Sequence, residues 1–404
     1  MSIDRKFRNL GTDSAPGQEV RQGGGSVEAL LRGDGLTGTP VDFSHGDVDA
    51  FEPTPGAFEE FSDGVARGGR QAYTEYRGDI GIREILAARL AEFTGAPVDA
   101  RDGLIITPGT QGALFLAVAA TVSHGDRVAI VQPDYFANRK LVAFLDAEIV
   151  PVALDYRSRT GSAGLALGDL EAAFESGAKV FLFSNPNNPC GVVYSPGEIE
   201  AIAALATRYG ATVIVDELYS RLRYSGTTYT HLRALELGPD NLVTILGPSK
   251  TESLSGYRLG VAFGAPGIIG RMEKLQAIVS LRAPGYSQAV LRIWFAEPAG
   301  WLDERIRAHQ AIRDELVERF RAIAGVEIRT PDAGSYLFPQ LPELVVSGAD
   351  FVRILRLQAD VIVTPGTEFS PHAGNSVRLN FSQDHRAAVA AVERVATLIE
   401  RYRA

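Results

Sequence analysis

The chain has 404 residues, of which 45% are hydrophobic and 22% are charged, and its mean hydropathy lies close to zero. These values are typical of a soluble globular protein with room for one large domain and a smaller one. The formal net charge of -9 at pH 7 argues against non-specific binding to nucleic acid and against attachment to an anionic membrane surface.

The first part of the chain is polar and rich in glycine, with the run Arg-Gln-Gly-Gly-Gly-Ser at residues 21–26. We expect Met1–Thr39 to be a flexible arm that contains one short helix at Val27–Arg32. Phe43–Pro55 is typical of a loop, and the apolar period of Ile80–Phe93 predicts a helix with one buried face. The N-terminal arm is therefore placed at residues 1–42.

From Leu104 onward, short apolar runs alternate with helical patterns. Continuous apolar strands separated by helices indicate a mainly parallel sheet that helices cover on both faces. The predicted strands are Leu104–Thr107, Val128–Gln132, Glu148–Val152, Lys179–Ser184, Thr212–Asp216, Leu242–Leu246 and Leu259–Phe263. The predicted helices between them include Gln111–Val122, Phe136–Leu145 and Pro196–Tyr209. This pattern predicts an α/β fold whose seven-stranded sheet forms a large domain at residues 43–295.

After Gly300 the pattern changes. A long charged helix is predicted at Trp301–Ala324, and an amphipathic helix at Arg386–Tyr402 ends the chain. The short strands predicted between these helices are Val326–Arg329, Gly334–Phe338, Val361–Val363 and Val377–Phe381. We therefore expect a smaller α+β domain at residues 296–404.

Residues suited to chemistry lie at the carboxyl ends of the predicted strands, where parallel sheets bind their ligands. Lys250 follows one such strand, and Arg258 comes eight residues later. A desolvated lysine amine near other cations loses its proton and can form a Schiff base, and Ser249 and Arg258 can hold a phosphate beside it. A pyridoxal phosphate site needs this combination, although Lys250 taken alone also fits an ordinary solvated loop lysine.

Three other strand ends carry residues that suit the same cofactor. The turn Thr107–Gly112 joins a strand to a helix, so its backbone N–H groups and the Thr110 hydroxyl can form an anion site. Tyr135 can lie flat over an aromatic ring. The loop Asn185–Gly191 contains two Asn-Pro steps and can fix the amide of Asn188 against a phenolic oxygen. A tight turn, a packing tyrosine and an ordinary proline turn are the alternatives.

Asp216 places a carboxylate at the end of a very apolar strand. A buried carboxylate needs a cationic partner. A protonated pyridine nitrogen would serve, and Asp216 would keep that ring able to accept electrons; the alternative is a helix N-cap. Tyr219 either donates to the phenolic oxygen of the cofactor or packs. Arg378 either clamps a carboxylate or forms a surface ion pair.

Taken in order, these residues resemble the class I/II aminotransferases, a family of pyridoxal phosphate enzymes of fold type I. The resemblance runs from about Phe43 to Phe381 and includes the tyrosine–glycine–arginine pattern that begins at Tyr73. It implies that the catalytic residues are Lys250 as the Schiff-base lysine, Asp216 as the pyridine-nitrogen partner and Tyr219 as the phenolic-oxygen donor. The other implied cofactor contacts are Gly109, Thr110, Gln111, Ser249 and Arg258 around the phosphate, Tyr135 on the ring, Asn188, and Tyr73 reaching the phosphate of the partner subunit.

The resemblance also implies the reaction and the substrate contacts. Arg378 and Asn188 would bind the substrate carboxylate, and the loop with His45 and Gly46 would lie against the substrate. The implied reaction is transamination between an L-amino acid and a 2-oxo acid. The same scaffold also serves loss or replacement of a γ-substituent, as in relatives that resemble aminocyclopropane-carboxylate synthase, and oxidation of amino acids by oxygen.

Some positions depart from the family pattern. Gly247 replaces a phosphate-binding serine, so Ser249 and Thr110 would carry more of the phosphate binding. His45 replaces a small or apolar residue and either contacts substrate, acts as a second acid/base, or hydrogen-bonds within its loop. The acidic neighbours Asp47, Asp49 and Glu252 would suit a cationic substrate side chain.

The expected partners and location follow from the same features. The resemblance implies a homodimer with shared active sites, and the histidines lack metal-ligand spacing. The lone Cys190 excludes an intrachain disulfide and suits the cytoplasm. Met1–Gly11 lacks the apolar core of a signal peptide, and no apolar run is long enough to span a bilayer. A non-catalytic sensor in a transcription regulator would need a DNA-binding segment, which this acidic chain does not show.

Overall fold

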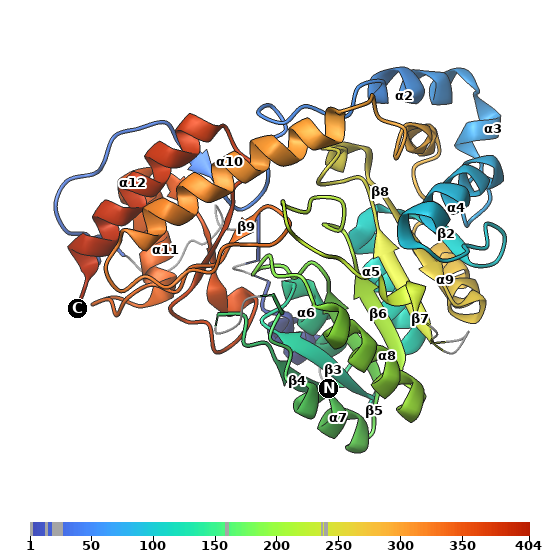
Figure 1. Cartoon of the computed structure of the whole chain (residues 1–404), viewed down its shortest axis with the longest axis horizontal. Helices are drawn as coiled ribbons and strands as arrows, with labels where there is room; N and C mark the ends of the chain where they lie inside the picture. Colours follow the sequence, from blue (N-terminus) through green and yellow to red (C-terminus); the bar gives the residue numbers. More distant parts are fainter. Residues whose placement is uncertain (1–2, 13–14, 18–26, 158–160, 236, 238–240) are drawn as a thin grey trace.

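A computed structural model describes residues 3–12, 15–17, 27–157, 161–235, 237 and 241–404 of the chain. Figure 1 shows one body around a large sheet and, at the other end of the long axis, a group of helices that includes α11 (Gly348–Ala359) and α12 (His385–Tyr402). The helix α10 (Trp301–Arg321) runs across the top of the molecule between them.

The large sheet has seven strands in the order β2-β8-β7-β6-β5-β3-β4. All neighbours pair in parallel except β8, which is antiparallel to both β2 and β7. The strands are β2 (Leu104–Pro108), β3 (Arg127–Gln132), β4 (Glu148–Ala153), β5 (Ala178–Ser184), β6 (Thr212–Asp216), β7 (Leu242–Leu246) and β8 (Leu259–Gly264). The predicted strands are confirmed, and so is the fold class of a mainly parallel sheet between helices with a smaller α+β part.

Alternate residues of the central strands enter two separate hydrophobic clusters, because successive side chains of a strand point to opposite faces. On one face, Phe181 and Phe183 pack with α7 (Leu167–Glu175) and α8 (Pro196–Tyr209). On the other face, residues such as Leu182 pack with the remaining covering helices. Those helices are α5 (Gly109–Thr121), α6 (Phe136–Phe144) and α9 (Pro266–Val279). A sheet buried on both faces can expose ligand-binding groups only at its edges and strand ends.

Helix boundaries follow local sequence signals. In α8, Ser195 and Glu198 form a capping box, Pro196 occupies the first turn, and Gly210 ends the helix with a positive φ of 61°. In α4 (Ile80–Thr94), the Asp79 side chain accepts a hydrogen bond from the backbone N–H of Ile82. These signals explain why the predicted bounds of both helices lie within one residue of the observed ones.

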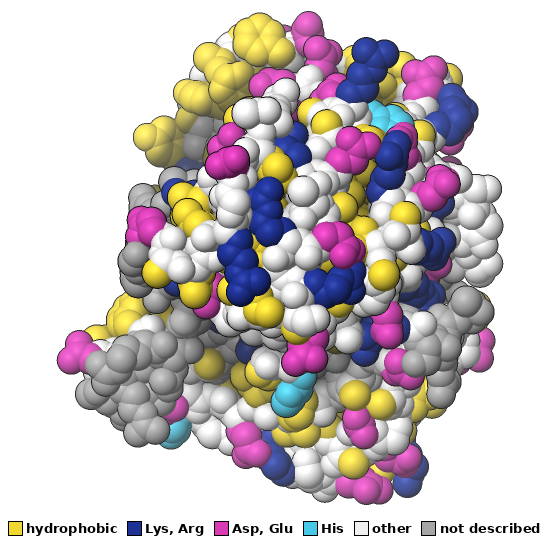
Figure 2. Space-filling view, turned by 90° about the vertical axis from the view of Figure 1, so that its left-hand side faces the viewer, with side chains coloured by type: hydrophobic (Ala, Val, Ile, Leu, Met, Phe, Trp, Pro, Cys, Tyr) yellow, Lys and Arg dark blue, Asp and Glu magenta, His cyan; other side chains and the backbone are white. Residues whose placement is uncertain are grey.

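The second part of the molecule combines α10, α11 and α12 with short strands. The strands β9 (Tyr336–Leu337), β12 (Val377–Asn380) and β11 (Thr364–Pro365) form an antiparallel sheet. The predicted strand Val326–Arg329 is wrong, because this half-exposed segment makes only one isolated bridge, from Glu327 to Gln340. Lys, Arg, Asp and Glu side chains are interspersed over the face that carries α11 and α12 (Figure 2), as expected for helices that bury one side only.

The segment before the large sheet packs with this second part. β1 (Val41–Asp42) pairs in parallel with β10 (Val361–Ile362), and Val41 and Phe43 belong to the same hydrophobic cluster as the core residues of α10 and α12. The domain limits 1–42, 43–295 and 296–404 stay predictions, and this packing favours assigning residues 41–43 to the second part.

The N-terminal arm contains structure that the sequence did not predict. α1 (Ile3–Leu10) lies against α6, where the Phe7 and Phe144 rings are 6.4 Å apart and the Lys6 amine lies 4.0 Å from the Phe144 ring. The short helix expected at Val27–Arg32 is a 3-10 turn at Glu28–Leu30. The glycine run at residues 21–26 lies outside the described residues. Within the part of the chain that is described, no helix has the length and apolar character that crossing a membrane requires.

A buried ionic cluster ties three segments of the large body together. Arg221, in the turn after β6, hydrogen-bonds Glu252 and also donates to both carboxylate oxygens of Glu297, at 2.8 and 3.0 Å. Its guanidinium lies 4.1 Å from the Phe295 ring. Because all three ionic side chains are buried, Arg221 fixes the loop of Glu252, two residues beyond Lys250.

We expect Arg221→Ala to lower the free energy of unfolding by about 3–5 kcal/mol, because it leaves two buried carboxylates without their cation. Arg208→Ala is the matched control: it removes an exposed ion pair with Glu171, and its cost should stay below about 1 kcal/mol. Urea denaturation of both variants measures the difference. Equal small losses would show that the Arg221 cluster does not stabilise the fold.

Candidate active site

Two adjoining cavities lie at the carboxyl edge of the large sheet. The inner cavity has a volume of about 460 Å³, and the outer cavity has a volume of about 980 Å³. His45, Ser249, Lys250 and Ser255 line both of them. Other residues of the inner cavity are Ser44, Thr110, Gln111, Tyr135, Asn188, Asp216, Tyr219, Arg258, Tyr336 and Arg378. The inner cavity thus brings the predicted site residues together, with three exceptions. Gly109 does not line it but packs against the Arg258 guanidinium. Gly46 lines only the outer cavity, and Tyr73 lines neither cavity.

The start of α5 and the segment before β8 form one end of the inner cavity. Gly109 has a φ of +76°, and a Cβ atom added to it would lie 2.6 Å from Nη2 of Arg258. Glycine therefore lets the guanidinium approach the first turn of α5, where backbone N–H groups are unpaired. A helix N-terminus beside an arginine is a strong anion site.

Packing explains why glycine occupies position 247. A Cβ atom there would lie 2.7 Å from Cγ2 of Thr110 and 3.2 Å from Cα of Gly260, so a serine does not fit without moving α5 or β8. Ser249 stands on the cavity wall instead, and its hydroxyl lies 3.4 Å from the carbonyl oxygen of Leu259. The transfer of phosphate binding to Ser249 and Thr110 stays a prediction.

Asp216 ends β6 and lines the inner cavity. Its carboxylate accepts a hydrogen bond from the backbone N–H of Leu218 at 3.0 Å, and burial raises its pKa from 3.8 to about 6. The helix N-cap alternative is wrong, since residues 218–221 form a turn and no helix begins there. A cation that entered the cavity beside Asp216 would lower this pKa and stabilise the carboxylate.

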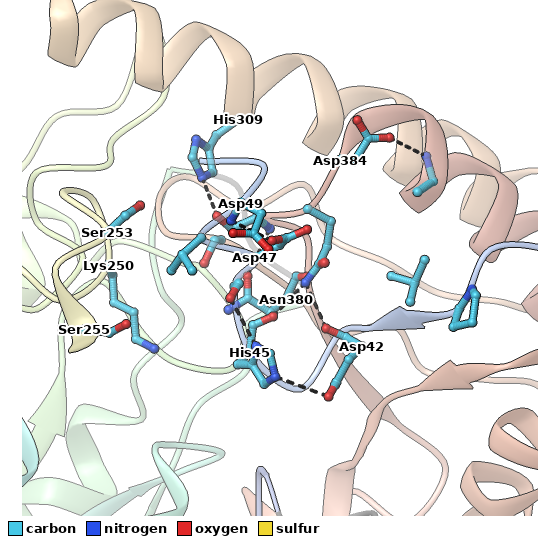
Figure 3. Close-up of a pocket in the computed structure, with 18 of the residues that line it drawn as sticks. Asp42, His45, Asp47, Asp49, Lys250, Ser253, Ser255, His309, Asn380 and Asp384 are labelled. Atoms are coloured by element: carbon cyan, nitrogen blue, oxygen red, sulfur yellow. Dashed lines mark hydrogen bonds and ion pairs between the residues drawn. The ribbon is translucent and has the colours of Figure 1, made fainter. Parts of the chain in front are cut away.

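Lys250 lines both cavities, and Figure 3 shows its side chain among the residues of the outer one. Among the described residues, its amine has no hydrogen-bond or ion-pair partner. The loop that carries it is held in place by the buried Glu252–Arg221 pair. A half-buried amine on a fixed loop, without an internal partner, is free to react with a ligand carbonyl.

Arg378 is a buried cation without an anionic partner among the described residues. Its Nη1 donates to Oδ1 of Asn188 and its Nη2 to the carbonyl oxygen of Ser44, both at 3.0 Å. Its guanidinium lies 4.2 Å from the Tyr336 ring and 4.6 Å from the Phe369 ring, and its Nε has no hydrogen-bond partner in the described part. The surface ion pair considered from the sequence is therefore wrong. A carboxylate ligand would satisfy the open donor and the charge.

A hydrogen-bond chain under the cavity holds Asn188. The Asn188 backbone N–H donates to the Ser184 hydroxyl at 3.1 Å, and that hydroxyl donates to Asp134 at 2.6 Å. Burial raises the pKa of Asp134 to about 7. The neighbouring Tyr135 donates from its hydroxyl to Oε1 of Gln111 at 2.9 Å. Sequence reasoning missed Asp134 and Ser184, although Asp134 directly precedes Tyr135.

Tyr219 has a partner that the sequence did not indicate. Its hydroxyl lies 2.6 Å from the hydroxyl of Tyr336, and the two rings meet edge to face at 5.2 Å. Tyr336 belongs to the strand β9, which lies within the predicted strand Gly334–Phe338, but the sequence gives no signal for its contact with Tyr219. Both hydroxyls are buried at the inner cavity.

His45 lines both cavities, and Figure 3 shows it next to Asp42 in the outer one. Its Nε2 lies 3.3 Å from a carboxylate oxygen of Asp42, and its Nδ1 lies 3.1 Å from the carbonyl oxygen of Gly46. The hydrogen bond with Asp42 raises the pKa of His45 from 6.5 to about 9 against the opposing effect of burial. His45 is therefore a cation at neutral pH.

Most acidic residues of the outer cavity accept hydrogen bonds from nearby backbone N–H groups. Asp47 accepts from the N–H of Asp49 at 2.8 Å, and Asp384 caps α12. Glu252 does not face the cavities, because it is only 1% exposed and pairs with Arg221; its predicted place beside the substrate is wrong. Within the described ranges, no group of His, Cys, Asp and Glu side chains is arranged to hold a metal ion.

A sheet that carries two arginine side chains and a lysine amine, unpaired within the described residues, at its carboxyl edge fits an α/β enzyme that binds an anionic carbonyl cofactor. The chain belongs to the aminotransferase class I and II family, which it matches over residues 39–395. It is 29% identical over 359 residues to an aspartate aminotransferase of Sulfolobus acidocaldarius, a match that covers 86% of this chain and 88% of that one.

Solved structures agree with this assignment. A crystal structure of an aspartate aminotransferase from Rhodobacter sphaeroides is 70% identical in sequence and has a TM-score of 0.95. The match covers 100% of this chain and 100% of that one. An aspartate aminotransferase from Thermus thermophilus with maleate is 23% identical, with a TM-score of 0.84, and the match covers 98% of this chain and all of that one; at this identity it supports the fold alone.

The chain is thus a pyridoxal phosphate-dependent aminotransferase of fold type I. The comparisons favour amino transfer over the γ-substitution and oxidase alternatives. The residues present fit the cofactor, because the Gly109–Arg258 end suits a phosphate and the Lys250 amine is free to bind the aldehyde.

We predict that Asp42→Asn lowers the pKa of His45 from about 9 toward its ordinary 6.5, because the variant removes the charge that holds the proton. In the wild-type protein the pair stabilises the fold below the unfolded pKa, and this contribution is lost as the pH rises through about 9. NMR titration of the imidazole measures the shift, with Asp384→Asn as the control. A wild-type His45 that titrates near 6.5 would contradict the pairing.

Proposed function

We propose that this chain transfers the amino group of L-aspartate to a 2-oxo acid. The observation that carries the proposal is the buried guanidinium of Arg378, which lacks an anion and shares the inner cavity with the free amine of Lys250. The names of the relatives support the choice of donor, since both the 70% identical structure and the Sulfolobus relative are named aspartate aminotransferases.

We propose that the predicted residues hold the cofactor as follows. Asp216 pairs with the pyridine nitrogen and keeps it protonated, while Tyr219 and Asn188 bind the phenolic oxygen. Lys250 holds the cofactor covalently through its amine and moves the proton at the substrate α-carbon. When bound, pyridoxal phosphate supplies an electron sink for that carbon. The remaining proposed contacts are Gly109, Thr110, Gln111, Ser249 and Arg258 at the phosphate, and Tyr135 on the ring.

L-aspartate carries two carboxylates, and the site offers two cations for them. We propose that Arg378 binds the α-carboxylate, with Asn188 beside it. The His45 imidazolium, which stands where the cavities meet, would attract the side-chain carboxylate, and the Gly46 backbone would border it. Asp47 and Asp384 are tied to local backbone groups, whereas Asp42 pairs with His45, so the substrate carboxylate would share this cation with Asp42.

We also propose a homodimer with shared active sites. Tyr73, just after α3 (Gly69–Ala72), is 80% exposed and lies outside both cavities of its own chain. The Arg282 guanidinium lies over the Tyr73 and Tyr76 rings, beside exposed apolar residues at the end of α9 such as Ile278 and Leu281. An exposed apolar surface around a tyrosine that lines neither cavity of its own chain suits a subunit interface.

A cytoplasmic location is part of the same proposal. Cys190, the one cysteine of the sequence, is free and buried, so its thiol needs no oxidising compartment. The proposed substrates are small water-soluble acids, and the proposed reaction needs no partner other than the second subunit.

We expect the holoenzyme to convert L-aspartate and 2-oxoglutarate into L-glutamate and the oxo acid of aspartate. Lys250→Arg should lower kcat by at least about 10³-fold, because its guanidinium can neither form the linkage nor carry the proton. Lys274→Arg, on α9, is the matched control and should retain activity. Chromatography of the amino-acid products measures both. Consumption of oxygen, or of S-adenosylmethionine without L-glutamate formation, would refute amino transfer.

The shared site predicts complementation between two defective chains. A Lys250→Ala chain and a Tyr73→Ala chain, refolded together, should form mixed dimers in which one site has an intact lysine and receives an intact tyrosine from the partner. Activity of the mixture should exceed that of either parent. A mixture of Lys250→Ala and Asp216→Ala chains is the control, because each chain supplies both residues to its own cavity, so every site of the mixed dimer keeps one defect. Equal behaviour of the two mixtures would exclude the shared site.

A further inference from the structure

Tyr219 and Tyr336 at the inner cavity have too few hydroxyl hydrogens for every arrangement of donors and acceptors. The Tyr219 and Tyr336 hydroxyls lie 2.6 Å apart in a buried setting, so one must donate to the other. Each hydroxyl has a single hydrogen and two acceptor lone pairs. If Tyr219 donates to the phenolic oxygen of the cofactor, it has no hydrogen left for Tyr336, and Tyr336 must be the donor within the pair.

We propose that Tyr336 is a positioning residue for amino transfer: its hydroxyl donates to Tyr219 and thereby aims the Tyr219 hydrogen at the cofactor. The inference rests on the proposed function, because it takes the Tyr219 contact from there. It assigns a role to a side chain that a two-residue strand delivers to the cavity.

The neighbours of Tyr336 favour this direction of donation. The Arg378 guanidinium lies 4.2 Å from its ring. In the structure the Tyr219 hydroxyl donates to Tyr336, so the proposed arrangement reverses this bond when Tyr219 turns its hydrogen toward the cofactor. Burial raises the pKa of Tyr336, whereas the positive charges of Arg378 and Lys250 lower it. Burial raises the pKa of Tyr219 well above its ordinary value. A more acidic hydroxyl is the stronger donor, and Tyr219 keeps its own hydrogen for the cofactor.

The backbone around Tyr336 is held independently of its hydroxyl. In the strand register, Tyr336 pairs with Asn380 of β12, and the hydroxyl of Tyr224 donates to the carbonyl oxygen of Gly334, two residues earlier. Phenylalanine at this position would therefore keep the edge-to-face packing on Tyr219 and remove only the hydrogen bond. The other titratable groups that face the pair are Tyr135 and Asp216.

The test is a pH titration of the visible absorbance of the holoenzyme, which follows the proton shared by the Lys250–cofactor linkage and the phenolic oxygen. Tyr336→Phe should raise the pKa of this proton by up to about one unit. Without Tyr336, Tyr219 donates a weaker hydrogen bond to the phenolic oxygen, so the Lys250–cofactor linkage holds its proton more tightly. Tyr219→Phe should raise it further, and the double variant should match Tyr219→Phe, since Tyr336 acts only through Tyr219. Tyr402→Phe removes a buried hydroxyl bonded to Gln358 and should leave the titration unchanged.

Two results would overturn the inference. One is a Tyr336→Phe holoenzyme that folds, by circular dichroism, and titrates like the wild type, which would mean that Tyr336 only packs. The other is a double variant whose shift exceeds that of Tyr219→Phe, which would mean that Tyr336 acts on the cofactor directly. The titration needs no substrate, so failure of the wild type to transfer amino groups would refute the proposed function and leave this measurement intact.

Discussion

A buried guanidinium joins the two parts of the molecule and shapes the site between them. Arg378 comes from the small antiparallel sheet, yet its donors reach Asn188 beside the large sheet and Ser44 in the N-terminal loop. Burying a cation without an anion is costly, and two carbonyl-type acceptors and two aromatic faces offset only part of that cost. Under the proposed function, the remaining demand for a carboxylate would make the cavity selective for acidic ligands.

The direction of one strand matters as much as this cation. Because β8 runs antiparallel to its neighbours, the residue just before it, Arg258, lies at the same edge as the carboxyl ends of β6 and β7. Gly109 lets the guanidinium approach the first turn of α5. The end proposed for the phosphate is thus built from close backbone packing. Such packing would hold the cofactor rigidly.

Much of this arrangement could be predicted from the sequence, because apolar strands and the residues that end them are local signals. Lys250, Asp216 and Asn188 were found in that way. α1 was missed because its support comes from α6, far along the chain. Glu252 was misplaced because its partner Arg221 lies 31 residues away. The strand that contains Tyr336 was predicted, but its role was missed because its partner Tyr219 lies 117 residues away. Contacts between distant segments account for these errors.

The central claim is that Lys250 is the amine that holds the cofactor. Sodium borohydride reduction of the holoenzyme, followed by mass mapping of its peptides, tests this claim most directly. We predict that the pyridoxyl phosphate group is found on Lys250. The other lysines, Lys6, Lys140, Lys179 and Lys274, should be unmodified at equimolar cofactor. Stoichiometric modification of one of these four, or no modification at all, would contradict the account.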